Sequence, residues 1–390
     1  MIDGQSRLRG VFIVAWAAII ASCSPASAQP TLDGLWANKA RLAYVRDLTF
    51  GNLTDVPGPA LEASTWYVAK SGVWYAFSRA DAPRPKSLCP NDHMKVVARE
   101  SRDKGVTWSA PAVVATPGMS KVGDGCAILD GSSFYDVSSG SWHLLAQCLD
   151  NNLKGGWALC HYSRRSPSPL GPFVADSANP VVRGGQLWSK ICGQSRTCPA
   201  DTVDEGTPDI VAKQNGQFLV TMHGYHGATK SGYRGVVTTP DFRTWAVSGK
   251  GLPGAAILGP RDCAAWLRAC VGFGEGSSVL ADGRIYMVSE SMDRNLACTP
   301  GQQWVFAIMR SGGPQWALAG TGGWERLPNN ALIRRKWRDP KMGCAVTYAR
   351  WLVDGRDIYL IYEDWEPGWS RVHRRLLKLV PGAGPPIQSL

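Results

Sequence analysis

A short hairpin pattern recurs five times along this chain of 390 residues, and it restricts the fold more than any other feature of the sequence. Each time, a glycine follows one short apolar segment and opens a second segment rich in aromatic and aliphatic residues. Asn-Gly and Asp-Gly between apolar segments favour tight hairpin turns, because these turns need positive φ. The glycines are Gly72, Gly140, Gly216, Gly283 and Gly355, which are 68, 76, 67 and 72 residues apart. This period predicts five similar β units.

Each hairpin is expected to lie in the middle of a four-stranded antiparallel sheet, so the five units predict an all-β protein, a five-bladed β-propeller. The outer strand of a unit carries a polar turn followed by an aromatic residue, as in 101–108 (SRDKGVTW), 168–173 (SPLGPF) and 240–245 (PDFRTW). Aromatic side chains at these places are suited to packing between neighbouring sheets. A β-sandwich with long irregular loops is the alternative. With 43 Gly, 26 Pro and only 19% charged residues, the composition excludes a coiled coil and a disordered chain.

The first 28 residues have the pattern of a cleaved secretory signal peptide. Arg7 and Arg9 precede an apolar stretch at 11–21, and small residues at 26–28 form a cleavage site. The stretch is too short to span a bilayer, so we expect a secreted or periplasmic protein without a transmembrane helix. We expect one propeller domain at 31–380 and a loose tail at 381–390. The alternative is a lipoprotein anchored through Cys23, because residues 20–23 (IASC) resemble a lipoprotein cleavage box.

Ten cysteines remain after Cys23 is set aside, and an even number in an exported chain indicates disulfide bonds. Cys192 with Cys198, and Cys263 with Cys270, are close in sequence and are the expected local bridges. The sequence does not determine how the other six cysteines pair.

The formal net charge of +11 leaves two interpretations open. The positive charge suits an acidic or envelope-associated polysaccharide, and a solvated basic surface explains it equally well. Export argues against nucleic acid as a partner. The oligomeric state is not predicted.

Acidic residues stand at the start of all five units. They are Glu62, Asp130, Glu205, Glu275 and Asp339. The first strands of propeller blades line a central channel, so carboxyl groups about 70 residues apart in sequence are predicted to converge. Like charges held close together raise the pKa of one carboxyl group, which can then donate a proton while another stays ionised. This pattern favours acid and base catalysis on a glycosidic bond.

Three segments resemble the five-bladed glycoside hydrolases, most closely the arabinanases and β-xylosidases of family 43. Residues 205–208 (EGTP) and the hairpin after them resemble the E-G-P strand of that family, 130–136 (DGSSFYD) its I-D-P-S-x-F-x-D segment, and 168–173 its outer strand. The resemblance implies Glu205 as the general acid, Asp130 as the residue that modulates the pKa of the acid, and Glu62 as the base, where the family has an Asp. It also implies an inverting hydrolase that acts on a pentose- or furanose-containing carbohydrate.

The chain departs from the family pattern in two further places. No Pro follows Asp130, and Thr207 is inserted between Gly206 and Pro208. No cofactor is expected to be required, and a structural calcium ion stays open. His223 and His226 lack an evident third ligand, so no metal site is predicted. The residues expected to bind the substrate are His223, Tyr225, His226, Trp66, Glu275 and Asp339.

Two other functions are kept as alternatives. Residues 101–108 also resemble the Asp-box of sialidases, whose mechanism relies on three arginines around the substrate carboxylate and a tyrosine nucleophile supported by Glu. One such box and five units rather than six favour the first interpretation. A non-catalytic sugar-binding propeller is the other alternative. Motifs of serine esterases, nucleotide-binding proteins and zinc proteases are absent from the sequence.

Overall fold

The computed structural model describes residues 29–50, 64–82, 93–150, 157–183, 186, 203–226, 231–247, 256–262, 270–293, 304–312, 324–328, 332–333, 346–365 and 372–387. The regular structure in these ranges is β-strand, apart from the short helix α1 (Asp33–Trp36) and the 3-10 turn η2 (Pro260–Asp262). The prediction of an all-β protein is confirmed. No helix in the described ranges is long and apolar enough to cross a membrane.

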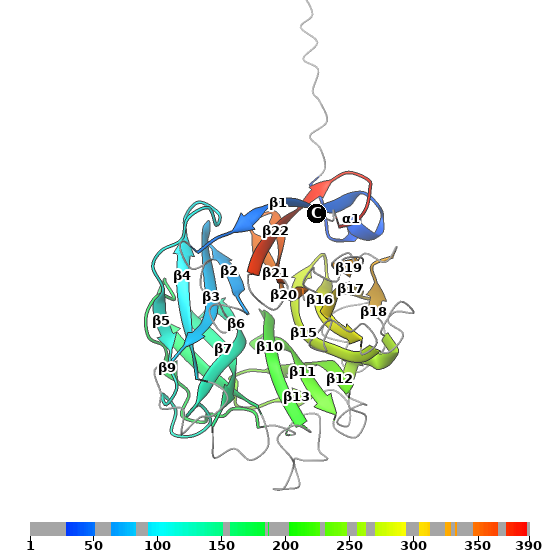
Figure 1. Ribbon diagram of the computed structural model, residues 1–390. Coiled ribbons are helices and arrows are strands. Elements are labelled where there is room, and N and C mark those ends of the chain that lie inside the picture. The colour runs from blue at the N-terminus through cyan, green and yellow to red at the C-terminus, as the bar shows by residue number, and fades with distance from the viewer. Residues whose placement is uncertain are drawn as a thin grey trace, which may run out of the picture.

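Three four-stranded antiparallel sheets are present (Figure 1). The first sheet contains β2 (Trp66–Lys70), β3 (Val73–Asp81), β4 (Met94–Ser101) and β5 (Ala112–Ala115). The second sheet contains β6 (Ala127–Asp136), β7 (Ser141–Leu149), β8 (Ala158–Arg165) and β9 (Val174–Ala175). The third sheet has the order β1 (Ala40–Leu48), β22 (Val372–Pro381), β21 (Asp357–Trp365) and β20 (Val346–Asp354). The first strand of the chain therefore completes the last sheet.

A ten-stranded sheet consists of two antiparallel groups. One group contains β10 (Val203–Gln214), β11 (Gln217–His226) and β12 (Ser231–Thr239), with β13 (Ala246–Val247) and β14 (Ala256–Leu258) on β12. The other contains β15 (Cys270–Ala281), β16 (Arg284–Asp293) and β17 (Trp304–Ser311), with β18 (Trp324–Arg326) and β19 (Leu332–Ile333) on β17. The groups meet at the parallel pair Gly232 and Gly272. A Cβ atom on Gly272 would collide with the carbonyl oxygen of Gly232, so this contact requires glycine.

The five predicted hairpin glycines lie in tight turns. Each has a positive φ, between 61° and 77°. Each turn joins the first and second strands of a group, for example β2 to β3 and β20 to β21. We expected the hairpins in the middle of their sheets. They lie at one edge instead, because the further strands of each sheet all lie beyond the second strand.

The first strands of the five groups lie next to one another. β2 contacts β6 and β20, β10 contacts β6 and β15, and β15 also contacts β20. Figure 1 shows these five strands around the middle of the molecule, with β1, β5, β9, β13 and β18 farther out. The segments where the first strands begin are thereby brought together, although they are far apart in the sequence.

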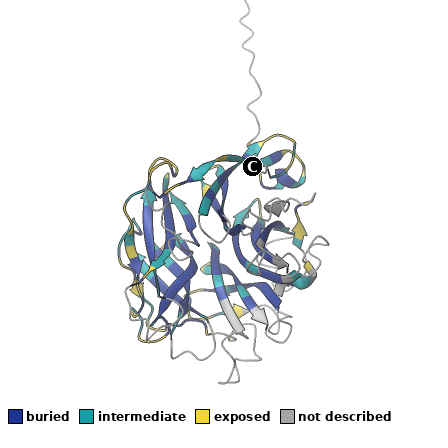
Figure 2. Ribbon diagram, in the orientation of Figure 1, coloured by how far each residue is buried: buried dark blue, intermediate teal, exposed yellow. Residues whose placement is uncertain are grey.

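Buried apolar side chains form clusters between neighbouring sheets. Figure 2 shows that many residues of the strands are buried. Between the first two sheets, Trp66 stacks on Phe77 with ring centroids 5.8 Å apart, and Tyr75 meets Trp142 edge to face. Between the β6–β9 sheet and the β10–β12 group, Leu145 packs in one cluster with aromatic residues that include Phe218. The core is thus a series of layers between sheets.

The end of the chain is held against β1. The Leu42 N–H donates a hydrogen bond to the carbonyl of Pro386 at 2.8 Å, and the Gly384 N–H donates to Oδ1 of Asn38 at 3.0 Å. Residues 382–387, where the sequence led us to expect a loose tail, therefore contact β1 and the residue Asn38 before it. Residues 388–390 and the predicted signal peptide lie outside the described residues.

A disulfide bond joins Cys148 on β7 to Cys160 on β8. Sequence spacing did not predict this pair. Cys126 and Cys270 are also disulfide-bonded. The expected partner of Cys270, which is Cys263, and the expected pair at 192 and 198 lie outside the described residues.

Candidate functional site

Four of the first strands carry a β-bulge near their start. Two consecutive residues there lie opposite one residue of the second strand, and the extra residue turns the direction of the side chains. The register shifts place these bulges at 129–130 in β6, 207–208 in β10, 274–275 in β15 and 348–349 in β20. The inserted Thr207 is therefore accommodated as one residue of a bulge.

Three residues at this level of the strands have backbone angles that non-glycine residues rarely adopt. The φ angles are 56° for Ser64, 38° for Thr207 and 54° for Tyr348. Thr207 and Tyr348 are the first residues of their bulges, and Ser64 lies just before β2. Such conformations persist only where the surrounding structure holds them, and they are frequent at functional sites.

Charged and polar side chains from all five groups of strands interact near the starts of the first strands. We call this set the central polar cluster. Its members are Arg79, Asp130, Asp209, Arg234, Glu275, Glu290, Tyr348, Arg350, Glu363 and Arg374. Arg79 and Tyr348 are partly exposed, and the other members are buried. Among the described residues, five carboxyl groups thus share the cluster with four guanidinium groups.

Arg79 connects the more exposed members of the cluster. Its Nη1 atom lies 3.5 Å from Oδ1 of Asp130, and its Nη2 atom donates a hydrogen bond to the hydroxyl oxygen of Tyr348 at 3.3 Å. These residues belong to β3, β6 and β20. Arg79 therefore fixes Asp130 and Tyr348 relative to each other, although they come from different sheets.

Glu290 lies beneath this layer, on β16. Its Oε1 atom accepts a hydrogen bond from the Tyr348 N–H at 2.9 Å, and its Oε2 atom accepts one from the Glu275 N–H at 3.3 Å. Burial raises the pKa of Glu290 to about 8, and the negative charges of Asp130 and Glu363 act in the same direction. Glu290 can therefore hold a proton at neutral pH.

Two buried arginines neutralise the carboxylates of the β10 and β15 strands. Arg350 forms an ion pair with Glu275 and donates to the carbonyl of Gly276 at 3.4 Å. Arg234 donates to the carbonyls of Thr207 and Gly274, each at 3.2 Å. Both arginines also stabilise the charge of Asp209, yet burial is the larger effect and raises the pKa of Asp209.

Glu363 completes the cluster on β21. It accepts a hydrogen bond from the Thr65 N–H at 3.4 Å and lies 3.7 Å from Nε of Arg374. Burial raises the pKa of Glu363, while Arg374 and Arg79 oppose the rise. Since Thr65 directly precedes β2, Glu363 links the last sheet of the chain to the first.

The structure brings together part of the predicted site. Asp130 and Glu275 are members of the cluster. The backbone of Glu205 lies in β10 opposite Gly224. Pro208, three residues after Glu205, is the second residue of the β10 bulge and corresponds to Asp130 in the β6 bulge. Glu62 and Asp339 lie outside the described residues, and the side chains of Glu205, Tyr225 and His226 are not described. The catalytic and substrate-binding assignments stay predictions.

Two other predicted substrate-binding residues are described in full. His223 on β11 is partly exposed and lies opposite Gly206 and Arg234 in the neighbouring strands. Burial, with a smaller effect from Arg234, lowers its pKa to about 3, so its ring is neutral at physiological pH. Trp66 is only 3% exposed and donates a hydrogen bond to the hydroxyl of Ser133 at 2.9 Å. Its packing between the first two sheets gives Trp66 a structural role.

Sequence reasoning missed eight members of the cluster, which are Arg79, Asp209, Arg234, Glu290, Tyr348, Arg350, Glu363 and Arg374. Glu290 and Glu363 each follow the apolar run of a second strand, in VSES (288–291) and IYED (361–364). A polar residue at that point, directly across from the start of the first strand, is a signal that could have identified both. Among the described residues, no group of three or more His, Cys, Asp or Glu side chains could hold a metal ion.

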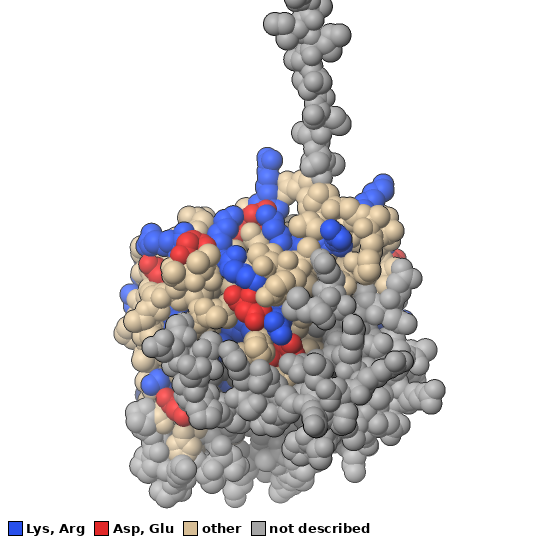
Figure 3. Space-filling view, turned by 45° about the horizontal axis from the view of Figure 1, so that its top comes forward, with Lys and Arg blue, Asp and Glu red and all other residues tan. Residues whose placement is uncertain are grey.

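Charged side chains outside the cluster are paired on the surface. Arg375 binds Asp47 at 3.0 Å and Asp364 at 3.1 Å, and Lys378 binds Asp357 at 2.8 Å. Figure 3 shows Lys and Arg side chains interspersed with carboxylates on the face that carries β1 and β22. Many positive charges there are therefore compensated locally.

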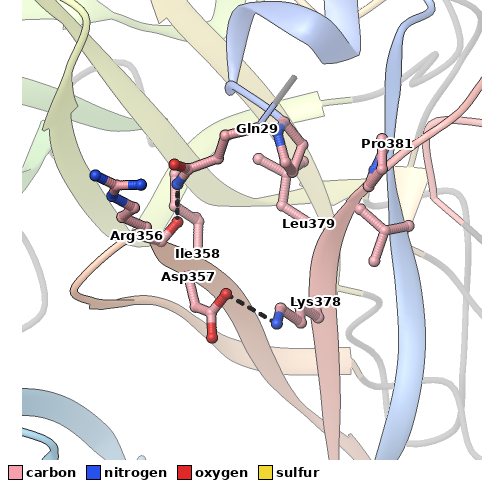
Figure 4. Close-up of a pocket in the computed structure, with 9 residues that line it drawn as sticks. Gln29, Arg356, Asp357, Ile358, Lys378, Leu379 and Pro381 are labelled. Carbon is pink, nitrogen blue, oxygen red and sulfur yellow. Dashed lines mark hydrogen bonds and ion pairs between the residues drawn. The ribbon is translucent and has the colours of Figure 1, made fainter. Parts of the chain in front are cut away.

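A pocket of about 260 Å³ lies beside β21 and β22 (Figure 4). It is lined by Arg356, Asp357 and Lys378, and the side chain of Gln29 donates a hydrogen bond to the carbonyl of Arg356 at 2.6 Å. Arg356 and Asp357 follow the far end of β20, whereas Tyr348 lies near its beginning. The pocket is therefore separate from the central polar cluster.

The polar turn at 101–108 closes on its own side chains. Asp103 accepts hydrogen bonds from the Ser101 hydroxyl at 2.7 Å and from the Thr107 N–H at 2.9 Å. The hydrogen bonds from the Thr107 hydroxyl, the Thr107 N–H and the Ser101 hydroxyl lower the pKa of Asp103 to about 2. The turn after β12 is similar, since Asp241 accepts from the Thr244 N–H at 2.7 Å. Both turns connect the third strand of a group to the strand outside it, away from the cluster.

No family model matches the sequence, and no curated protein sequence matches it. Solved structures match the fold. A thermostable family-43 glycoside hydrolase is 15% identical, with a TM-score of 0.52 over 85% of this chain and 92% of that chain. An α-L-arabinofuranosidase from Lactobacillus brevis is 11% identical, with a TM-score of 0.52 over 86% of this chain and 97% of that chain. An α-L-arabinofuranosidase from Podospora anserina, in complex with cellotriose, is 11% identical, with a TM-score of 0.50 over 89% and 99%. At these identities the likeness concerns the fold, and these structural relatives are glycoside hydrolases.

Proposed function

We propose that the protein is an exported glycoside hydrolase, built as a closed five-bladed β-propeller, that acts on glycans containing pentose or furanose sugars. The observation that carries the proposal is the convergence of carboxyl groups from separate sheets in the central polar cluster. The neighbouring first strands, the pairing of β1 with β22 and the likeness to solved glycoside hydrolases support the propeller. Export rests on the signal-peptide pattern at 1–28.

The reaction needs one carboxyl group that gives a proton and one that takes a proton. In our proposal Glu205 protonates the glycosidic oxygen while the bond from that oxygen to the anomeric carbon breaks. Glu62 takes a proton from the water molecule that attacks the anomeric carbon from the opposite face, which inverts the configuration. Asp130 on β6 would adjust the pKa of Glu205 on β10, and the contact between these two strands supports that role.

The assay measures sugar released from arabinan, xylan and arabinogalactan by the mature protein and by a Glu205→Gln variant. Loss of the general acid is expected to lower kcat by roughly 10²- to 10⁴-fold. An aryl glycoside with an acidic phenol leaves without protonation, so the variant should recover much of its activity on that substrate. Glu325→Gln is the matched control, because Glu325 is an exposed residue on β18.

Two results would contradict the proposal. Equal release by the Glu205→Gln variant on natural glycans would remove Glu205 from the mechanism. Binding of a glycan without any release by the wild type would favour the non-catalytic sugar-binding propeller.

The sialidase-like alternative is tested by a sialyl-glycan included in the same panel. Arg79, Arg350 and Tyr348 lie in the central polar cluster and provide residue types that this mechanism uses. Burial and the nearby Asp130 and Glu290 raise the pKa of Tyr348, which opposes formation of the phenolate that a tyrosine nucleophile needs. We therefore favour the carboxyl-based mechanism.

A further inference from the structure

We propose that Tyr348 is a substrate-binding residue whose hydroxyl group donates a hydrogen bond to an oxygen atom of the bound sugar. No residue assignment from the sequence includes Tyr348. The inference rests on the proposed function only in that the ligand is a sugar.

The backbone holds Tyr348 in a specific and unfavourable conformation. It is the first residue of the β20 bulge, and its φ angle of 54° is rare for a residue with a bulky side chain. The hydrogen bond from its N–H to Glu290 Oε1, at 2.9 Å, anchors this backbone to the neighbouring group of strands. The surrounding structure therefore maintains a strained residue in the middle of the molecule, which is common where a side chain contacts a ligand.

The partners of the Tyr348 hydroxyl group determine what it can offer to a ligand. A phenol hydroxyl group donates one hydrogen bond and can also accept. Arg79 Nη2 donates to the oxygen at 3.3 Å, and a guanidinium group cannot accept a hydrogen bond in return. Within the described part of the chain, no residue accepts a hydrogen bond from the Tyr348 hydroxyl group. The proton is thus available to an acceptor that enters the site.

The contacts of Arg79 orient the hydroxyl group of Tyr348. Its other terminal nitrogen lies 3.5 Å from Asp130 Oδ1, and its guanidinium carbon lies 5.6 Å from the centroid of the Tyr348 ring. Because a cation faces the hydroxyl oxygen, the electron pairs of that oxygen are directed toward Arg79. The O–H bond must then point away from Arg79.

Exposure separates a layer that a ligand can reach from the layer beneath it. The side chains of Arg79 and Asp130 are 18% and 12% exposed, whereas those of Arg350 and Glu363 are each 2% exposed. Tyr348 is also partly exposed. Burial of the ring and nearby carboxylates raise the pKa of Tyr348, so the hydroxyl group keeps its proton at physiological pH. Sugar hydroxyl and ring oxygens are the acceptors that such a donor fits.

The experiment compares the wild type with Tyr348→Phe, which retains the ring and removes the hydroxyl group. Steady-state kinetics on the released sugar and calorimetric binding of arabino- and xylo-oligosaccharides are measured for both proteins. We expect KM and Kd to rise about tenfold, the effect of losing one hydrogen bond, and kcat to change far less. Tyr44→Phe is the matched control, because the hydroxyl group of Tyr44 on β1 also takes part in a hydrogen bond, to Asp47 at 3.1 Å, and Tyr44 is not a member of the cluster.

A second measurement uses only the wild type, so it does not depend on the folding of a variant. Monodeoxy derivatives of the bound sugar are compared with the parent sugar. One derivative should bind about tenfold more weakly if a sugar hydroxyl oxygen accepts the Tyr348 proton. In Tyr348→Phe, the same derivative and the parent sugar should bind equally well.

The outcomes separate the two proposals. Sugar release with unchanged KM and Kd in Tyr348→Phe would overturn the role of Tyr348 and leave the proposed function intact. Binding without release in the wild type, weakened in Tyr348→Phe, would overturn the proposed function and support the role of Tyr348. A wild type that neither binds nor releases any of these sugars would overturn both. If Tyr348→Phe turned over saturating substrate about a thousandfold more slowly at unchanged Kd, Tyr348 would be a chemical participant, which contradicts a binding role.

Discussion

Replacing Glu290 with Gln is expected to change the stability of the protein little at low pH and to raise it at high pH. The pKa of Glu290 is raised from 4.5 to about 8 in the folded protein. Between these values the unfolded chain releases a proton that the folded protein retains, so the stability of the wild type falls as pH rises. Each pKa unit corresponds to about 1.4 kcal/mol, which gives an upper limit of about 5 kcal/mol above pH 8.

A glutamine at position 290 cannot ionise and does not carry this cost. At pH 5 the protonated Glu290 and a glutamine present similar groups to the Tyr348 and Glu275 N–H groups, so the two proteins should differ by about 1 kcal/mol or less. At pH 9 the variant should be the more stable protein by several kcal/mol. The stability difference between Glu290→Gln and the wild type therefore grows through neutral pH and levels off above pH 8.

Urea unfolding followed by tryptophan fluorescence at pH 5, 6, 7, 8 and 9 measures this difference. The pKa values of Asp209 and Glu363 are also raised, so both proteins lose stability toward high pH, and only their difference isolates Glu290. Glu325→Gln, which removes a surface ion pair with Arg310, should differ from the wild type by about 1 kcal/mol or less, and by the same amount at every pH. A difference that stays constant within about 0.5 kcal/mol from pH 5 to 9 would refute the claim that the cluster holds Glu290 protonated.

Two further predictions concern stability. Arg350→Met should lower the free energy of unfolding by about 3 to 5 kcal/mol, because Glu275 loses its buried counter-ion. In urea titrations, the double variant Arg350→Met with Glu275→Gln should recover at least half of this loss. Replacing Cys148 and Cys160 with Ala should cost about 3 kcal/mol, since the bond closes a loop with a sequence separation of 12, and an equal urea midpoint in both proteins would show that the loop is not restrained in this way.

Local chemistry explains why the hairpins could be predicted from the sequence. A turn such as Asn215-Gly216 needs positive φ at both residues, and the structure has 50° and 74° there. This preference depends only on neighbouring residues, so it can be read along the chain without knowledge of the fold. The same applies to the side-chain hydrogen bonds that close the turn around Asp103.

The composition of the central polar cluster could be predicted only in part. Asp130 and Glu275 were found because they begin repeated units. Glu290 and Glu363 were missed because they lie near the ends of second strands, where their position opposite or next to a bulge depends on strand register. A one-residue change of register moves a side chain to the other face of a sheet, and no residue type alone indicates a bulge.

The sequence by itself determined an all-β chain of five repeated hairpin units, because turn preference and apolar patterning are local properties. The tertiary structure alone decided that Arg79, Asp130, Glu290 and Tyr348 meet, since they belong to four different groups of strands and interact only when the first strands come together. It also decided the protonation of Glu290. The raised pKa of Glu290 arises from burial and from charges contributed by other sheets, and neither exists in the extended chain.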